Sequence, residues 1–250
     1  MSDDNEQVLK PSALLAYRRA NGQLPDFPPP RAVIFAPQKS LADYILRRHA
    51  TKKVKGFLGE FYLLKPVNGQ IALSTSFGIG APVIAGLTDE FAALGVKQFV
   101  LIGMAGGLQP ELTTGSLVIS TAAICGEGTS RHYLPSHPTV DSSPEMIARI
   151  SQILTELKHR HTLGTTWTTD APFRELRKDV LEWEQRGVLA VDMEAAAMLA
   201  VAGSMNLSAL AAFAIADQLS GGVWRMANDL RPVQQGLSIL FEAVFEFLMH

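Results

Sequence analysis

Two carboxylates stand in one of the most apolar stretches of the chain, GVLAVDMEAAAMLAVAGSM (residues 187–205), which contains no cation. Placed on a helix, Asp192 and Glu194 share their faces only with alanine, leucine, methionine and valine. An unpaired buried carboxylate is costly, so backbone, water or a ligand must supply hydrogen bonds to these acids. The structural alternative is that Asp192 caps the helix and Glu194 complements the helix dipole in its first turn.

A third acid, Asp217, ends the apolar run ALAAFAIAD and precedes the loop-forming sequence QLSGG. In open α/β sheets, ligands bind at the carboxyl ends of strands. An acid that emerges from so apolar a strand suits a general acid working near neutral pH. The alternative is an aspartate that begins an Asx turn.

Two glycine-rich segments follow predicted strands. In FVLIGMAGGLQP, the glycines Gly103, Gly106 and Gly107 either let the backbone approach a ligand or form an ordinary tight turn, and their spacing is not that of a dinucleotide-binding fingerprint. The second segment, SFGIGAP, leads into a helix predicted to begin near Pro82, whose N-terminus is suited to an anion.

Other chemistries have little support in the sequence. His159 and His161 lie in the charged segment LKHRHTLG, which we interpret as a solvated edge without a third metal ligand. No Cys/His spacing indicates zinc, and no G-x-S-x-G nucleophile motif is present. We therefore expect no metal and no bound cofactor.

Alternating strands and helices must position these residues. Short β-rich runs such as RAVIFA, QIALSTS and LGTTWTT alternate with helical patterns, of which APVIAGLTDEFAALG ends at Gly95 and SPEMIARISQILTELK starts with a capping Ser143. This order predicts a layered α/β fold with a parallel or mixed sheet. Residues 1–30, which end in LPDFPPP, are predicted to be an N-terminal extension, and residues 31–250 a single domain.

Composition narrows the class of protein. A net charge of −2 and 18% charged residues give no basic footprint for nucleic acid or an anionic membrane. The single cysteine, Cys125, cannot form an internal disulfide, the start MSDDNEQ is acidic, and no apolar run is long enough to span a bilayer. These features predict a cytoplasmic protein that binds neither nucleic acid nor membrane.

Taken in order, the segments SFGIGAP, GMAGGLQPELTTGSLVIS, GEGTSRHYLP, TTDAPFRE, VDMEAAA and IAD resemble the nucleoside phosphorylase superfamily, which includes purine nucleoside and uridine phosphorylases. The resemblance runs from about Ala32 to Leu219, and VDMEAA is its most specific part. It implies a three-layer α/β/α sandwich around a mixed, barrel-like central sheet.

The resemblance also implies roles for individual residues. Asp217 matches the catalytic acid that protonates the leaving base. The ribose would be held by Met193, Glu194 and Met104, the base by Phe173, Gly106 and Gly107, and phosphate by Lys55, Gly103 and Lys39. In this interpretation the hydroxyls of a sugar supply the donors that Glu194 needs.

Departures from the family pattern concentrate on phosphate. Where the family has two arginines, this chain has Leu41 and Leu101, and Met104 replaces a Ser or Thr that contacts phosphate and sugar. Pro172 occupies the more usual aromatic position beside Phe173. Two guanidinium groups and a hydroxyl are thereby lost from the contacts that phosphate would have.

The sequence therefore predicts an enzyme that cleaves the N-glycosidic bond of a purine nucleoside or uridine, with phosphate as the default acceptor. Alternatives are a hydrolytic nucleosidase and a nucleoside-binding protein without turnover. GTSRHYLP and TTDAPFRE look like the uridine-cleaving branch, whereas Asp217 suits protonation of a purine, and the choice stays open. We expect a homo-oligomer in which Lys55 completes a neighbour's active site.

Overall fold

The structure is a computed structural model that describes residues 7–250, so most of the acidic start of the chain lies outside the described residues. Within residues 7–250 the chain forms seven α-helices and one eleven-stranded sheet. The strands are β1 (Ala32–Ala36), β2 (Thr51–Val54), β3 (Glu60–Leu64), β4 (Ile71–Thr75), β5 (Gln98–Gly107), β6 (Leu117–Gly126), β7 (Thr139–Asp141), β8 (His161–Thr169), β9 (Ala190–Asp192), β10 (Ser208–Gln218) and β11 (Arg225–Met226). The helices are α1 (Pro11–Ala20), α2 (Lys39–Arg48), α3 (Ala81–Leu94), α4 (Pro144–Glu156), α5 (Arg177–Gln185), α6 (Ala195–Ser204) and α7 (Arg231–Met249).

Five strands close into a barrel, and the others extend the sheet outward. The closed path runs β5–β10–β6–β8–β9 and returns to β5, while β1, β4, β3 and β2 continue from β5 in that order. Parallel pairs such as β5–β10 occur beside antiparallel pairs such as β6–β10, so the sheet is mixed. The predicted α/β fold around a mixed, barrel-like sheet is confirmed.

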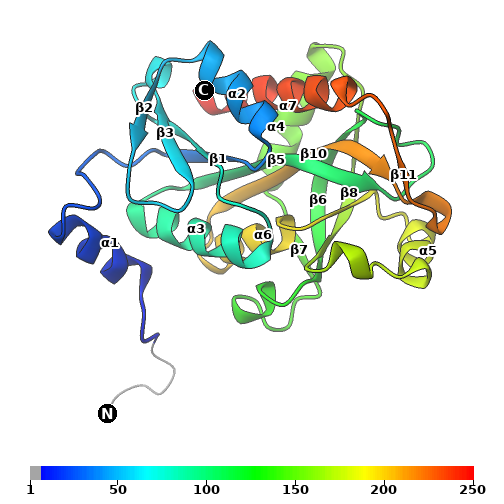
Figure 1. Cartoon of the computed structure of the whole chain (residues 1–250), viewed down its shortest axis with the longest axis horizontal. Helices are drawn as coiled ribbons and strands as arrows, with labels where there is room; N and C mark the ends of the chain where they lie inside the picture. Colours follow the sequence, from blue (N-terminus) through cyan, green and yellow to red (C-terminus); the bar gives the residue numbers. More distant parts are fainter. Residues whose placement is uncertain (1–6) are drawn as a thin grey trace.

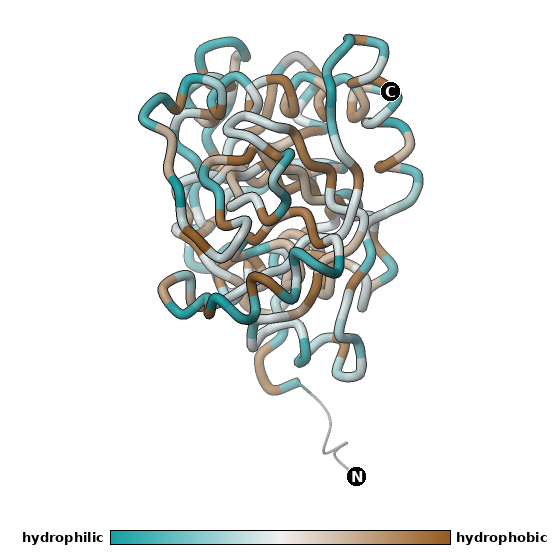
Figure 2. The backbone as a smooth tube through the Cα atoms, turned by 90° about the vertical axis from the view of Figure 1, so that its right-hand side faces the viewer, coloured by the Kyte–Doolittle hydropathy of each residue, from teal (hydrophilic) through white to brown (hydrophobic). Residues whose placement is uncertain are grey.

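Helices cover both faces of the sheet. Figure 1 shows α2, α4 and α7 on one side and α3 and α6 on the other. Each face has its own hydrophobic cluster: residues of α7, α4 and α2 pack in one, and residues of α3 and α6 pack in the other. In Figure 2 the hydrophobic stretches gather in the middle of the molecule and the hydrophilic stretches lie mostly at its periphery.

The sequence signals for helix ends are largely confirmed. Helix α3 begins after Gly80, carries Pro82 in its first turn and ends at Gly95, whose φ of 121° suits glycine. Ser143 occupies the N-cap position of α4 as predicted, but its side chain makes no capping hydrogen bond. Pro144 supplies the fixed φ that starts this helix, and it has no N–H to satisfy there.

The N-terminal segment packs on the body of the protein through α1. Leu15 and Leu24 are buried, and Arg18 forms an ion pair of 2.6 Å with Glu90 of α3. The carbonyl oxygen of Gln23 lies so close to Gly56, in the β2–β3 loop, that a Cβ at Gly56 would stand 2.8 Å from it. The division into an extension (1–30) and a domain (31–250) stays a prediction.

Within the described residues, no helix combines the length and apolar character needed to cross a membrane. The most apolar helix, α6, is short, and all residues from Ala195 to Ala202 are buried. Its small side chains allow close packing against both α3 and β10. This burial on every side explains why the segment around Asp192 and Glu194 is so apolar.

Candidate functional site

Asp192 caps the start of α6 with its side chain, although the N-cap position itself is Glu194. It is the last residue of β9, and its Oδ1 accepts hydrogen bonds from the backbone N–H groups of Glu194 (2.7 Å) and Ala195 (2.8 Å). The hydroxyl of Thr168 lies 3.1 Å from the same oxygen and accepts the N–H of Ala196. Burial raises the pKa of Asp192 to about 7, an effect opposed by these backbone hydrogen bonds. The structural alternative for Asp192 therefore agrees with its contacts.

Glu194 has a different partner from the one expected in either interpretation. Helix α6 starts at Ala195, so the assumption that both acids lie within a helix is wrong, because the chain is still extended at Asp192 and turns only at Glu194. Oε1 of Glu194 accepts a hydrogen bond of 2.6 Å from the backbone N–H of Gly80, the N-cap of α3. Only 8% of Glu194 is exposed, and burial raises its pKa.

The glycine turn before α3 thus has an anion supplied by the protein itself. Gly78 and Gly80 both have positive φ (94° and 105°), which brings the amide of Gly80 to the carboxylate of Glu194. The positive end of the α3 dipole favours this negative charge. A buried acid is thereby held in one position at the junction of β9, α3 and α6.

The glycines of β5 form no turn. Gly103, Gly106 and Gly107 lie within an extended strand, and the tight-turn alternative is wrong for them. Their role is close approach: a Cβ at Gly106 would lie 2.4 Å from Cδ1 of Leu219 and 3.4 Å from Oδ1 of Asp217. Met104 is 39% exposed, in a strand whose other residues from Phe99 onward are buried.

Asp217 lies on β10 directly beside these glycines. The pairing of β10 with β5 shifts by one residue at Ala216, so Asp217 pairs with Gly106 instead of Gly107. Such a bulge re-aims the side chain that follows it. Gly106 pairs on its other side with Val191 of β9, so Asp217 and the start of the Asp192–Glu194 segment flank the same glycine.

Trp224 holds the carboxyl group of Asp217. Its indole Nε1 donates a hydrogen bond of 2.6 Å to Oδ2, and 65% of the tryptophan is exposed. The short antiparallel pair β10–β11, with Asp217 opposite Met226, folds Trp224 back onto the acid. Sequence reasoning missed Trp224 because nothing in its neighbourhood indicates that the chain returns to the end of β10.

Glu175 is a second missed residue. It follows the short η3 helix (Pro172–Arg174) and is half-buried. Burial, followed by the negative charge of Asp217, raises the pKa of Glu175 to about 7. The motif TTDAPFRE, which ends at Glu175, identified this region of the sequence as part of the site. Only the fold brings Glu175 near Asp217.

The residues expected to contact phosphate or the base are not brought together by the fold as Asp217 and Gly106 are. Leu41 and Leu101 are 1% and 0% exposed and belong to the two hydrophobic clusters on opposite faces of the sheet. Lys39 is bound to Asp43 one helical turn away (2.6 Å), and Lys55 is exposed, with no hydrogen bond or ion pair within residues 7–250. Phe173 is 99% exposed, so no packing fixes its ring.

One polar group from the loop between β1 and α2 does reach the glycines of β5. The side-chain oxygen of Gln38 would lie 3.8 Å from a Cβ at Gly103. This oxygen is buried and has no hydrogen-bond partner among the described residues. A buried oxygen without a donor indicates a place for water or a ligand.

No metal-binding arrangement of three or more His, Cys, Asp or Glu side chains occurs in the described part of the chain. The histidine pair is less solvated than predicted: His159 and His161 are half-buried, and the ring of His161 bonds the hydroxyl of Ser151 at 2.7 Å.

Comparison with known families settles which group of proteins shares this architecture. The model of the Phosphorylase superfamily matches residues 30–241. The chain belongs to the phosphorylase superfamily.

The relatives within the superfamily are named for different substrates, guanosine and uridine. The chain is 31% identical over 158 residues to a guanosine phosphorylase of Halorubrum lacusprofundi. The matched stretch covers 62% of this chain and 64% of that protein. It is 30% identical over 170 residues to a uridine phosphorylase of Treponema pallidum (64% of each chain) and 25% identical over 157 residues to that of Escherichia coli (57% of this chain and 62% of the relative). The matched part thus spans less than two thirds of each relative.

Proposed function

We propose that this superfamily member cleaves the N-glycosidic bond of a nucleoside. The observation that carries the proposal is the flanking of Gly106 by Asp217 on one strand and by the strand leading to Glu194 on the other. Neighbouring strands are about 4.8 Å apart, so β10 and β9, which flank β5, lie roughly 10 Å apart, and the two acids reach the site from opposite sides of β5. One acid is suited to protonate a leaving base, the other to bind the ribose.

The roles follow from the two settings. Asp217 is half-exposed and receives the indole N–H on Oδ2, so Oδ1, the oxygen that faces Gly106, is left to contact the leaving base. Glu194 is buried and held by the amide of Gly80, so it is preorganised to accept ribose hydroxyls and to stabilise positive charge on the sugar in the transition state. Met193 and Met104 supply the apolar surface beside the sugar, and Gly107 and Phe173 a surface for the base.

The substrate is a purine nucleoside or uridine, in line with the guanosine and uridine phosphorylases among the relatives. Protonation by Asp217 favours a purine, because a purine base leaves more readily when its ring nitrogen is protonated. A nucleoside panel, assayed for base release with purified protein, tests this proposal. Release of no base from any nucleoside, together with nucleoside binding, would favour a binding protein without turnover.

The acceptor is phosphate bound weakly, and water is the second candidate. Each missing charge-assisted contact is worth about 1.5–3 kcal/mol, so two or three missing contacts weaken phosphate affinity by at least about 10²-fold. The unpartnered oxygen of Gln38 near Gly103 favours water, since it offers an acceptor for one of its protons. No cofactor takes part in either reaction.

Phosphate titration from micromolar to tens of millimolar, with base and ribose 1-phosphate measured separately, distinguishes the two acceptors. We expect a weak response without tight saturation. Saturation in the micromolar range with stoichiometric sugar phosphate would contradict the weak-phosphate proposal and assign strong binding to Lys39 or Lys55.

The proposed assembly is a homo-oligomer in which Lys55 acts on the neighbour's site. Its support is the exposure of Lys55, on a loop that Gly56 and Gly59 hold in place, without a partner within residues 7–250. Mixed oligomers of Lys55→Ala and Asp217→Asn chains should exceed the summed activity of the two separate variants. Equal activities in demonstrably mixed oligomers would exclude a shared site.

A further inference from the structure

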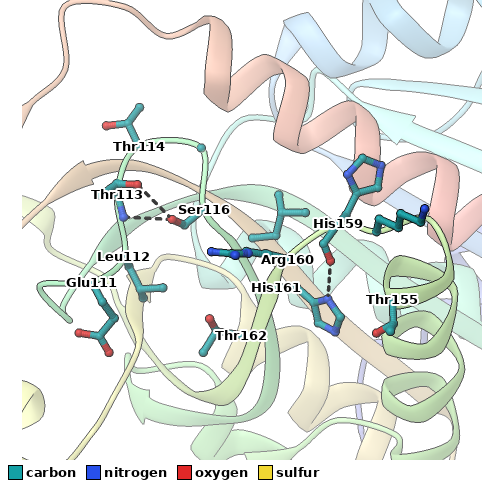
Figure 3. A pocket seen from close by; sticks show the side chains of 13 residues that line it. Glu111, Leu112, Thr113, Thr114, Ser116, Thr155, His159, Arg160, His161 and Thr162 are labelled. Carbon is teal, nitrogen blue, oxygen red and sulfur yellow. Dashed lines mark hydrogen bonds between the residues drawn. The ribbon is translucent and has the colours of Figure 1, made fainter.

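A second cavity, which we call the loop pocket, lies between residues 111–117 and residues 155–162. It has a volume of about 890 Å³ and includes none of the candidate-site residues. Figure 3 shows its two walls, one formed by the segment after β5 and the other by the end of α4 and the start of β8. A volume of this size accommodates a small phosphorylated metabolite.

The first wall is fixed to the barrel. The N–H of Gly115 donates to the carbonyl oxygen of Ile215 at 2.8 Å, and Leu117 pairs with His161 across β6 and β8. A Cβ at Gly115 would lie 2.7 Å from the ring of Pro232, so the loop is pressed against the start of α7. The pocket therefore has a preformed wall.

The second wall carries two cations that the protein leaves without partners. Lys158 and Arg160 are exposed, and within residues 7–250 neither side chain has a hydrogen bond or an ion pair. Figure 3 shows Arg160 extending across the pocket toward Ser116 and Thr113. Glu111 is the one acid that lines the loop pocket, on the opposite wall.

Lys158 occupies a position where glycine would be favoured. Helix α4 ends in a Schellman motif: the N–H of His159 donates to the carbonyl oxygen of Leu154 (2.8 Å), and Lys158 adopts a left-handed φ of 61°. A cation near a helix C-terminus complements the dipole, which accounts for one basic residue here. It does not account for a strained lysine followed two residues later by Arg160.

His161 positions this turn. Its Nδ1 donates to the carbonyl oxygen of His159 (3.0 Å), and its Nε2 meets the hydroxyl of Ser151 (2.7 Å). Both ring nitrogens are thus used within the protein, and Lys158 and Arg160 remain for a ligand. The guanidinium of Arg160 matches the oxygens of a phosphate group, and Thr114 and Thr162, which also line the pocket, have hydroxyls that can donate to a ligand.

We propose that the loop pocket binds a phosphomonoester of a sugar or nucleoside, with Arg160 and Lys158 on the phosphate and Glu111 on a hydroxyl or amino group of the ligand. This site is independent of the glycosidic-bond chemistry proposed above. Its lining residues, which include two cations and one acid, match a ligand with an anionic end and a hydrogen-bond-donating end.

Calorimetric titration of the full chain with a nucleoside 5′-monophosphate, the same nucleoside and inorganic phosphate tests the proposal. Glu194→Gln chains are titrated in parallel, so that any contribution from binding at the candidate active site appears as a difference in affinity between the two chains. We expect Lys158→Gln/Arg160→Gln to weaken monophosphate binding at least about tenfold, and Lys52→Gln/Lys178→Gln, a control with two exposed lysines elsewhere, to leave it unchanged. Glu111→Gln should weaken binding of the monophosphate but not of inorganic phosphate.

A further variant separates ligand binding from a purely structural role. Lys158→Gly relaxes the left-handed turn, so we expect a higher melting temperature together with weaker monophosphate binding. Absence of monophosphate binding in the Glu194→Gln chain, or equal affinities of the Lys158→Gln/Arg160→Gln and control chains, would overturn the proposal.

Discussion

The two proposed sides of the candidate site differ in polarity. On the proposed sugar side, the acid Glu194 is buried. On the proposed phosphate side, the two positions expected to carry arginine hold the buried Leu41 and Leu101. Glu194 is bound by the amide of Gly80 at 2.6 Å, and Asp192 anchors the segment beneath it. Leu41 and Leu101 instead pack in the hydrophobic clusters, and Lys39 is committed to Asp43. Polar contacts are thus concentrated around Glu194, whereas the two positions at which the family resemblance implies arginine are apolar and buried.

The strongest test of the sugar and base side is Asp217→Asn. We expect turnover on ordinary nucleosides to fall roughly 10²–10⁴-fold, because the base then leaves without a proton. A nitrophenyl riboside, whose leaving group needs no protonation, serves as the control substrate and should lose little activity. Equal losses on both substrates would assign Asp217 to binding or folding.

Glu194→Gln tests the ribose contact itself. The amide keeps an acceptor for Gly80 N–H but removes the charge that stabilises the sugar in the transition state, so kcat/KM should fall by about 2–3 kcal/mol, or roughly 30–150-fold. Circular dichroism and thermal unfolding should show a native fold. An unfolded variant whose remaining folded fraction binds nucleoside normally would show that Glu194 is structural.

Trp224→Phe tests whether Asp217 needs the hydrogen bond that the indole N–H of Trp224 donates. Phenylalanine retains an aromatic ring but cannot hydrogen-bond Oδ2, so we expect a decrease of about 3–10-fold in turnover on nucleosides. The nitrophenyl riboside should again be nearly unaffected. If both substrates lose activity equally, or if neither does, Trp224 does not act through Asp217.

The phosphate side should respond more weakly. Lys55→Ala should raise the phosphate concentration needed for half-maximal rate by about 5-fold, the effect of roughly 1 kcal/mol in an exposed contact. Lys39→Ala is the matched control, and its effect should be under about twofold because its ammonium is already paired. A loss of 10²-fold in either variant would contradict the contrast between the two sides.

Asp192→Asn should have the smallest effect on turnover, under about threefold, since Asp192 caps α6 and does not face the sugar. Its signature is the pH dependence of stability. The pKa of Asp192 is raised to about 7 in the folded state, so its stabilising contribution is complete below about pH 4 and is lost as pH rises toward 7. Melting temperatures of the variant should therefore decline less between pH 4 and 7 than those of the parent chain.

Sequence patterns predicted four of the five barrel strands and the ends of α3, because hydrophobic runs and Gly/Pro signals are local, whereas the short β9 lay in a segment interpreted as helical. The partners of the acids were not predictable in the same way. Glu194 meets Gly80 across 114 positions of the chain, and Trp224 meets Asp217 through a two-residue strand with no hydrophobic pattern. The glycines of β5 resembled a turn in the sequence. Glycine is needed there because side chains of β10 and Leu219 pack against the strand, and these contacts form only when the barrel closes.

The hydrogen bond between Trp224 and Asp217 also places an intrinsic fluorophore at the candidate site. Trp167 and Trp183 lie with ring centroids 6.1 Å apart in a separate cluster, whereas Trp224 is mostly in solvent and touches the acid directly. Fluorescence from Trp224 should therefore be quenched or shifted when a ligand enters the site beside Asp217. Replacing Trp167 and Trp183 by phenylalanine would leave an emission signal confined to the place where the glycosidic bond is proposed to break.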